Sequence, residues 1–255
     1  MRRLAAAFLL LLATEGASDP VDNGNALALV AEGLVTEGRP TYPGHVPGYS
    51  VVGPDGRAYG KFGLGQSLVL VPAVWGTRVL SLGLDDPEHV RLATTLLWHA
   101  TAAALGALLF VALAALGEGL GMSPRAAVLG AAVGVVATPA WEYARVFYSE
   151  GLLGACVAGA LAAAVWAVRG GSARGAAVAG LAAGGALLTK PTGGLVLVAV
   201  AAYLALVRGR RVRRLAGYAL GAAGPVALTL AYNALRTGSP WSTCPTFVAL
   251  TGMTR

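Results

Sequence analysis

The chain has 255 residues, of which 56% are hydrophobic and only 12% are charged, and its mean hydropathy is +0.66. A soluble domain carries about 25% charged residues, so this chain has too little charge to cover a water-facing surface of its size. The composition excludes an ordinary soluble globular protein and predicts an integral membrane protein. The net charge of +7 is mostly explained by membrane topology, as the loops below indicate, so no nucleic-acid partner is predicted.

The first expected element is a short apolar helix behind two arginines, Arg2 and Arg3. Its continuous apolar run, residues 4–13, is shorter than the roughly 20 residues that cross a bilayer. The pattern resembles a signal peptide. We interpret it as a retained first span over residues 4–17, completed by Thr14 to Ala17.

Residues 18–90 are expected to form a long first external loop. It contains an amphipathic stretch at 26–38, a turn-rich segment at 39–56 and an apolar run at 64–83. The apolar run carries polar residues and a proline, which suits a helix lying in the membrane interface. Charge parity between the flanking loops also requires that this run does not cross the membrane.

Six further apolar runs predict membrane spans, at about 91–117, 126–140, 151–168, 175–189, 192–207 and 215–232. The abundance of alanine and glycine suits close helix packing in lipid. The positive-inside rule places short arginine-bearing loops in the cytoplasm. These loops hold ten of the 19 basic residues: Arg2, Arg3, Arg125, Arg169, Arg174, Arg208, Arg210, Arg211, Arg213 and Arg214.

The predicted fold is therefore all-α, a polytopic transmembrane helix bundle of about seven spans that forms a single domain over residues 1–255. Its N-terminus is expected in the cytoplasm. Eleven of the 12 acidic residues then fall outside, with Glu118 as the exception. This asymmetry predicts that any chemistry takes place at the external face.

The first external loop offers a carboxylate and a lysine as a candidate pair. Asp22 follows the first span, and Lys61 comes about 40 residues later, at the start of the interfacial helix. A carboxylate can accept a proton from an acceptor hydroxyl, and a lysine can stabilise charge on a departing phosphate. The alternative is structural: Asp22 caps the following helix and Lys61 snorkels to lipid headgroups.

The second external loop, residues 138–150, gathers Glu142, Arg145 and Glu150 with several aromatic side chains. An ionisable group at the start of a span is costly unless it is paired or functional. The alternatives are a favourable charge at a helix N-terminus and an interfacial aromatic belt. Lys190, in the third external turn, runs against the positive-inside bias, and an anionic ligand would explain it.

Several motifs in this order resemble the GT-C membrane glycosyltransferases, closest to the bacterial relatives of protein O-mannosyltransferases and of lipid A aminoarabinose transferases. An early external aspartate is followed by Tyr-x-Lys-x-Gly at 59–63. The remaining motifs are Thr-Pro-x-Trp-x-Tyr at 138–143, Tyr-Ser-Glu at 148–150, Leu-Leu-Thr-Lys-Pro at 187–191 and Tyr-Asn-x-Leu-Arg-x-Gly-Ser-Pro at 232–240. The resemblance covers nearly the whole chain.

The resemblance implies an inverting transferase that takes a sugar from a polyprenyl-phosphate donor at the outer face of the bacterial plasma membrane. Asp22 would be the catalytic aspartate, with Asp19 as the fallback, and Lys61 would face the lipid phosphate. The donor's isoprenoid tail would lie in a groove between helices, among membrane lipids. The other predicted substrate-binding residues are Tyr59, Glu142, Tyr143, Arg145, Tyr148, Glu150 and Lys190.

The chain departs from the family pattern in two places. Gly60 and Asn23 stand where the family often has acids. Family members also usually continue through more helices beyond the position of Arg255. Two interpretations stay open: the sequence is a fragment of a longer member, or it is a complete but shorter protein. No cofactor is predicted, and the need for a divalent metal stays open, as do the sugar, the acceptor, protein partners and the oligomeric state.

Two other functions compete with glycosyl transfer. A transporter or lipid flippase would use glycine-rich helices equally well, but it predicts ionisable residues near the membrane midplane. Apart from His99, the polar groups of this chain cluster at the outer ends of the spans, which favours chemistry at the surface. A non-catalytic membrane partner is the third alternative.

Overall fold

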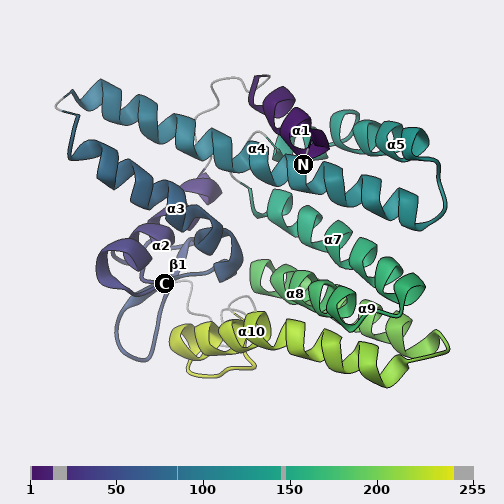
Figure 1. The fold of residues 1–255 in the computed structure, drawn as a ribbon. Helices are drawn as coiled ribbons and strands as arrows, with labels where there is room; N and C mark the ends of the chain where they lie inside the picture. The colour runs from purple at the N-terminus through teal and green to yellow at the C-terminus, as the bar shows by residue number, and fades with distance from the viewer. Residues whose placement is uncertain (1, 14–21, 85, 145–147, 244–255) are drawn as a thin grey trace.

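The described part of the chain, residues 2–13, 22–84, 86–144 and 148–243 of a computed structural model, is mostly helical. A helix bundle carries a smaller unit built from α2, α3 and a β-hairpin at one end (Figure 1). In chain order the elements are α1 Arg2–Ala13, α2 Asp22–Glu37, β1 Ser50–Val52, β2 Ala58–Gly60, α3 Leu64–Ser81, α4 Pro87–Gly119, α5 Pro124–Val136, α6 Ala140–Tyr143, α7 Ser149–Gly170, α8 Ala173–Thr189, the 3-10 helix η1 Pro191–Gly193, α9 Gly194–Leu206 and α10 Arg211–Thr237.

Three of the described helices, α4, α7 and α10, are long and apolar enough to cross a membrane. Three shorter apolar segments accompany them, namely α5, α8 and the stretch Pro191–Leu206. The apolar helices indicate a membrane-associated protein. They coincide with the six apolar runs expected after residue 90, while the count of seven spans stays a prediction. Residues 14–17 of the first expected span lie outside the described residues.

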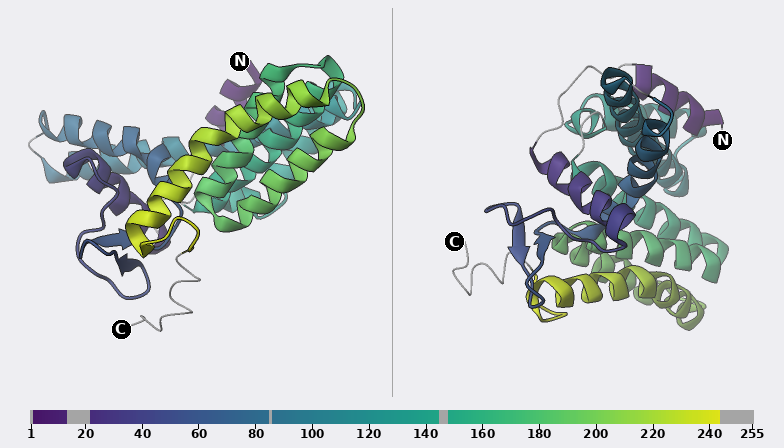
Figure 2. Two further views of the ribbon diagram at one scale, coloured as in Figure 1. Left: turned by 90° about the horizontal axis from the view of Figure 1, so that it is seen from below. Right: turned by 90° about the vertical axis from the view of Figure 1, so that its left-hand side faces the viewer.

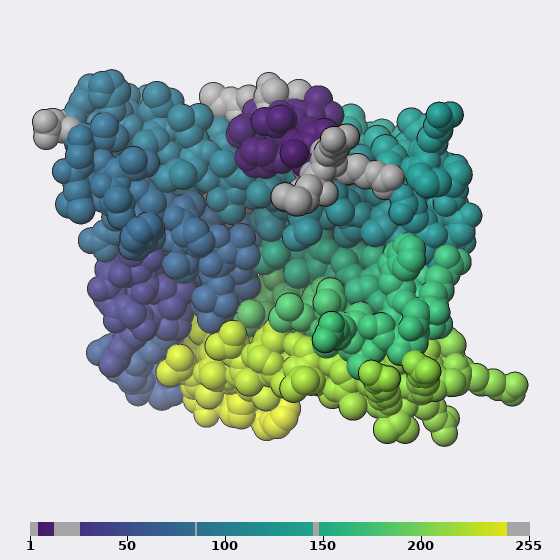
Figure 3. All heavy atoms as spheres, in the orientation of Figure 1, coloured from purple at the N-terminus to yellow at the C-terminus, as the bar shows by residue number. Residues whose placement is uncertain are grey.

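Glycine allows two helices of the bundle to touch through their backbones. A β-carbon at Gly221 of α10 would lie 1.9 Å from the carbonyl oxygen of Ala177 in α8. One at Gly180 of α8 would lie 2.0 Å from the carbonyl oxygen of Tyr218. Such distances leave no room for a side chain, so α8 and α10 pack as the small-residue composition predicts. Figure 3 shows α10 along one edge of the molecule and α1 across α4 at the opposite edge.

The smaller unit is held together by α2, α3 and the first half of α4 (Figure 2). The buried hydroxyl of Ser67 in α3 donates to the carbonyl of Leu27 in α2, at 2.9 Å. Leu27, Leu70 and Ala102 belong to one buried apolar cluster that joins the three helices. Helix α3, the run expected to lie in the interface, is not among the candidate spans.

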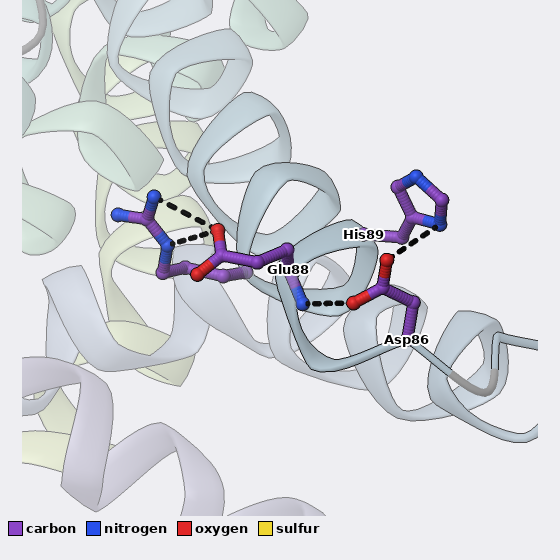
Figure 4. A network of polar contacts seen from close by, with 4 residues as sticks. Asp86, Glu88 and His89 are labelled. Carbon is purple, nitrogen blue, oxygen red and sulfur yellow. Dashed lines mark hydrogen bonds and ion pairs between the residues drawn. The ribbon is translucent and has the colours of Figure 1, made fainter.

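Helix α4 starts with a cap that explains its first residue. The Asp86 carboxylate accepts a hydrogen bond from the Glu88 N–H at 2.9 Å, and Pro87 occupies the first helical position. Figure 4 shows this cap together with the His89–Asp86 contact and the exposed ion pair of Glu88 with Arg91. Because of this cap, α4 begins four residues before the expected start of the span.

The β-hairpin corrects the all-α prediction for the first external loop. β1 and β2 pair antiparallel, with Ser50 opposite Gly60 and Val52 opposite Ala58. In the connecting turn, the Asp55 carboxylate accepts from the Arg57 N–H at 3.1 Å, and Gly56 has a positive φ. Strands of three residues are too short to show the alternation of apolar and polar residues that predicts a strand. The sequence therefore indicated only the turns at 39–56 and not the strands.

A second correction concerns α5, which ends at Val136 and not at residue 140. The Thr138 hydroxyl donates to the carbonyl of Gly134 at 2.6 Å, and Pro139 follows. Proline has no N–H with which to continue the helical ladder. The short helix α6 therefore forms separately, with Trp141, Glu142 and Tyr143 in it.

The two ends of the bundle differ in charge. The arginine-bearing ends of α7, α8, α9 and α10 lie together, since Arg210 approaches Gly171, and Arg169 donates to the carbonyl of Glu118 at 3.5 Å. At the opposite end, Glu150 lies at the start of α7, Lys190 directly follows α8, and the loop after β2 contacts the end of α8. The helix directions therefore place the predicted cytoplasmic arginines of these helices at one end.

We predict that Leu82, which is exposed directly after α3, lies on the external side. In a background with both native cysteines, Cys156 and Cys244, replaced by alanine, Leu82→Cys should react with a membrane-impermeant maleimide in spheroplasts. Arg174→Cys at the arginine end is the matched control and should react only after permeabilisation. Labelling of Leu82→Cys only after permeabilisation would mean that α3 crosses the membrane.

Candidate functional site

The end of the bundle opposite the arginines carries an ion pair between two neighbouring helices. Glu150 is the second residue of α7, and Lys190 directly follows α8 in an extended conformation. The Lys190 ammonium donates to the Glu150 carboxylate, and each side chain is about one third exposed, at 32% and 33%. The structure thus joins two predicted site residues that are 40 positions apart. An ammonium has three donors, so Lys190 retains hydrogen-bonding capacity beyond this pair.

Aromatic side chains flank the start of α7. The rings of Tyr143 and Tyr148 meet edge to face, with centroids 6.0 Å apart. Helix α6 lies against α7 so closely that a β-carbon at Gly151 would be 2.8 Å from the Tyr143 carbonyl oxygen. Tyr143, Tyr148 and Glu150 therefore form one half-buried surface, and Glu142 is exposed beside it.

Lys61 lies on the loop between β2 and α3, where its ammonium is held by aromatic rings. The nitrogen is 5.4 Å from the centroid of the Tyr49 ring and 5.1 Å from that of Phe62. Such distances are typical of cation–π contacts. In the part of the chain that the structure describes, no carboxylate forms an ion pair with Lys61. Its half-buried positive charge is therefore open to an anionic ligand.

The segments that carry the two lysines touch each other. A β-carbon at Gly63 would lie 2.2 Å from the carbonyl oxygen of Thr189, and one at Gly65 would lie 2.5 Å from the Thr189 hydroxyl. This contact needs glycine at both positions, because any side chain would collide with backbone or hydroxyl atoms. The start of α3, three residues after Lys61, therefore packs on the end of α8, one residue before Lys190.

Arg236, near the end of α10, holds the Lys61 loop in place through hydrogen bonds. Its guanidinium is 3% exposed and donates to the carbonyls of Lys61 and Phe62 at 2.9 and 2.8 Å. It also donates to the side-chain oxygen of Asn233 at 2.7 Å and stacks over the ring of Tyr232. Arg236 belongs to the motif at 232–240, but no role was predicted for it. The sequence did contain an indication, because a charged side chain in an apolar helix requires partners.

A second buried polar residue, Gln66 of α3, was also given no role by the sequence. Its side chain is almost fully buried next to Gly65, and its oxygen has no hydrogen-bond partner among the described residues. A buried acceptor of this kind calls for an explanation, and a ligand or water hydroxyl would satisfy it. Gln66 is therefore an unsatisfied buried acceptor next to the contact between the start of α3 and the end of α8.

Tyr59, one of the predicted substrate-binding residues, makes structural contacts within the hairpin unit. Its ring is buried against Tyr232, and its hydroxyl donates to the Asp55 carboxylate at 2.8 Å. Burial, followed by the hydrogen bond and the negative charge of Asp55, raises the pKa of Tyr59 to about 12. The hydroxyl is thus protonated and already engaged, and it stabilises the hairpin.

The predicted catalytic aspartate is placed only by its backbone. Asp22 begins α2, but its side chain is outside the described set, as are Asp19 and Arg145 entirely. Helix α2 packs on β2, because a β-carbon at Gly60 would lie 2.8 Å from the side chain of Val30. The helix that carries Asp22 is therefore fixed to the strand that leads to Lys61.

Comparisons with protein-family models, curated proteins and solved structures found no match. Across the described ranges, no cluster of three or more histidine, cysteine, aspartate or glutamate side chains is arranged to hold a metal ion. What this end of the bundle offers is two lysine ammonium groups, aromatic rings and a buried amide acceptor.

Proposed function

We propose that the protein is a membrane glycosyltransferase that transfers a sugar from a polyprenyl-phosphate donor to an acceptor at the external face of the bacterial plasma membrane. The observation that carries this proposal is the half-buried ammonium of Lys61, which lies between aromatic rings without a carboxylate partner in the described chain. Such a cation at the end of an apolar bundle suits a lipid phosphate at headgroup level.

The proposed reaction is a single displacement. The acceptor hydroxyl oxygen forms a bond to the anomeric carbon of the sugar, while the bond from that carbon to the phosphate oxygen breaks. Asp22 takes the proton of the hydroxyl, and the phosphate leaves with the bonding electron pair. Lys61 and Lys190 stabilise the negative charge on the leaving phosphate. Attack opposite to the leaving group inverts the anomeric centre.

The remaining predicted residues have supporting roles in this proposal. Glu150 orients Lys190 through their ion pair, and Glu142 lies beside it in an exposed position where it can bind sugar hydroxyls. Tyr143 and Tyr148 offer rings for stacking on a sugar face. Arg145 is retained in this proposal as a further cation for the phosphate.

The distribution of charge in the candidate spans favours surface chemistry over transport. In the described parts of α4, α7 and α10, the acidic and basic side chains lie close to helix ends. A transporter would require such groups near the midplane, where its substrate binds. His99 of α4 is the only described histidine in the middle of a candidate span.

The donor-binding role of the lysines can be measured directly. Lys61→Met and Lys190→Met should each weaken binding of a polyprenyl-phosphate sugar in nanodiscs, because each removes one charge-assisted contact to the phosphate. Such a contact contributes roughly 1.5–3 kcal/mol, or about a ten- to a hundredfold change in affinity. Replacement by arginine should restore little, because the planar guanidinium reaches differently from a compact ammonium.

Glu150→Gln is the matched control, because it breaks the same ion pair while leaving the Lys190 ammonium in place. Donor binding should weaken less in this variant than in Lys190→Met, because the ammonium stays in place and loses only the carboxylate that orients it. Unchanged donor affinity in both lysine variants would show that these residues are headgroup anchors and would favour the transporter alternative.

A further inference from the structure

The turn between α9 and α10 lies at the opposite end of the bundle from the candidate site (Figure 1). It lines an open hollow of about 650 Å³. Four exposed arginines line it: Arg208, Arg210, Arg211 and Arg213. Of the described residues that line this hollow, none carries a negative charge. Four like charges on six consecutive residues repel one another, so this arrangement is favourable chiefly when an anion is bound.

The turn is held in shape by a fifth arginine. Arg214 is buried, and its guanidinium donates to the carbonyls of Val207 at 2.6 Å, Arg208 at 3.4 Å and Gly209. These three carbonyls belong to the residues that directly follow α9, so one buried side chain holds the start of the turn. Membrane orientation requires positive charge in this loop but not a buried arginine that fixes its shape.

Arg210 is the one described residue other than glycine with a positive φ, at 46°. A left-handed backbone is costly for a residue with a side chain, and such strain tends to persist at functional positions. Here it begins α10 with the side chain of Arg210 beside Gly171, at the end of α7. The backbone therefore fixes Arg210 between two loops of the bundle.

Two apolar side chains line the same hollow. Leu206, the last residue of α9, is 82% exposed, and Val212, in the first turn of α10, is 77% exposed. Large apolar groups of this exposure beside arginines suit a ligand with a negative head and an apolar body. A free phosphate ion would leave them in water, whereas a phospholipid would cover them with its acyl chains.

We propose that the arginine hollow binds the phosphate headgroup of an anionic phospholipid, with its acyl chains against Leu206 and Val212. The guanidinium groups bind the phosphate oxygens through charge-assisted hydrogen bonds, for which their planar donor geometry is suited. This site is separate from the proposed glycosyl-transfer site, and it would exist even if the protein had another activity.

The test compares two pairs of arginines that carry the same charge at the same end of the bundle. Arg211→Gln with Arg213→Gln removes half of the arginines in the hollow, and Arg125→Gln with Arg174→Gln removes two exposed arginines outside it. Each purified double variant is titrated with phosphatidylglycerol, and with phosphatidylcholine for comparison, in detergent, and bound lipid is counted by native mass spectrometry.

Each arginine that contacts the lipid headgroup contributes about a fivefold change in affinity for anionic lipid, whereas arginines away from the hollow make no such contact. The hollow variant should therefore bind phosphatidylglycerol roughly 25-fold more weakly than the wild type, while the control variant retains wild-type affinity. Equal losses in both variants would show that only the total charge matters, and no loss in either would show that the hollow does not bind the lipid. Each of these results would overturn the proposal.

Two further measurements keep the outcome decisive. The double variant Arg211→Lys with Arg213→Lys keeps the positive charge that orients the protein in the membrane. It therefore controls for altered membrane insertion of the glutamine variant. Its affinity for phosphatidylglycerol should still fall several-fold, because lysine lacks the planar donor geometry of arginine. Inorganic phosphate should displace the lipid far less readily than short-chain phosphatidylglycerol does. Displacement by both at equal concentrations would assign the hollow to free phosphate and overturn the lipid proposal.

Discussion

Arg236→Met is expected to lower the free energy of unfolding by roughly 3–5 kcal/mol, because several buried groups lose their partner at once. The variant leaves the carbonyls of Lys61 and Phe62 and the side-chain oxygen of Asn233 without the donors they have now. Each unsatisfied buried group costs about 1–3 kcal/mol. Denaturation in detergent micelles, followed by circular dichroism, measures the loss.

Two controls separate this effect from the loss of a charge. Arg236→Lys keeps the charge but cannot reach several carbonyls at once with a planar fork, so it should be intermediate. Arg125→Met removes an exposed arginine and should change stability by less than about 0.5 kcal/mol. If Arg236→Met were as stable as Arg125→Met, the Lys61 loop would not depend on α10.

Asp22→Asn is expected to reduce sugar transfer about 10²–10⁴-fold, the contribution of a positioned general base. The substitution keeps the size and most hydrogen-bonding capacity of the side chain while removing its basicity. It should leave membrane insertion and donor binding unchanged, because Asp22 acts on the acceptor in the proposed mechanism. Single-turnover transfer from a radiolabelled polyprenyl-phosphate sugar, with insertion checked in parallel, measures the effect.

Asp19→Asn is the matched control, since it removes a neighbouring carboxylate from the same segment. It should retain most of the activity. Full activity of Asp22→Asn together with loss of activity in Asp19→Asn would move the base to Asp19. Full activity in both variants would contradict a carboxylate base in this segment.

The helices of the bundle were readable from the sequence because each is a long apolar run bounded by polar residues. Six expected runs after residue 90 correspond to α4, α5, α7, α8, the stretch Pro191–Leu206 and α10. Their boundaries depend on local chemistry that hydropathy does not measure. Asp86 caps α4 earlier than the apolar run suggests, and Pro139 ends α5 sooner. The three-residue strands of the hairpin carry no periodic signal at all.

The sequence by itself indicated a membrane-associated protein and the apolar helices of the bundle, and it singled out Lys61 and Lys190 as candidate site residues. Those conclusions follow from composition and local pattern. Only the tertiary structure decided which of these residues meet. The pairing of Glu150 with Lys190, the contact of Gly63 with Thr189 and the fastening of the Lys61 loop by Arg236 all join segments distant in the chain. Such contacts depend on how the helices cross, and packing against neighbouring helices sets those crossings.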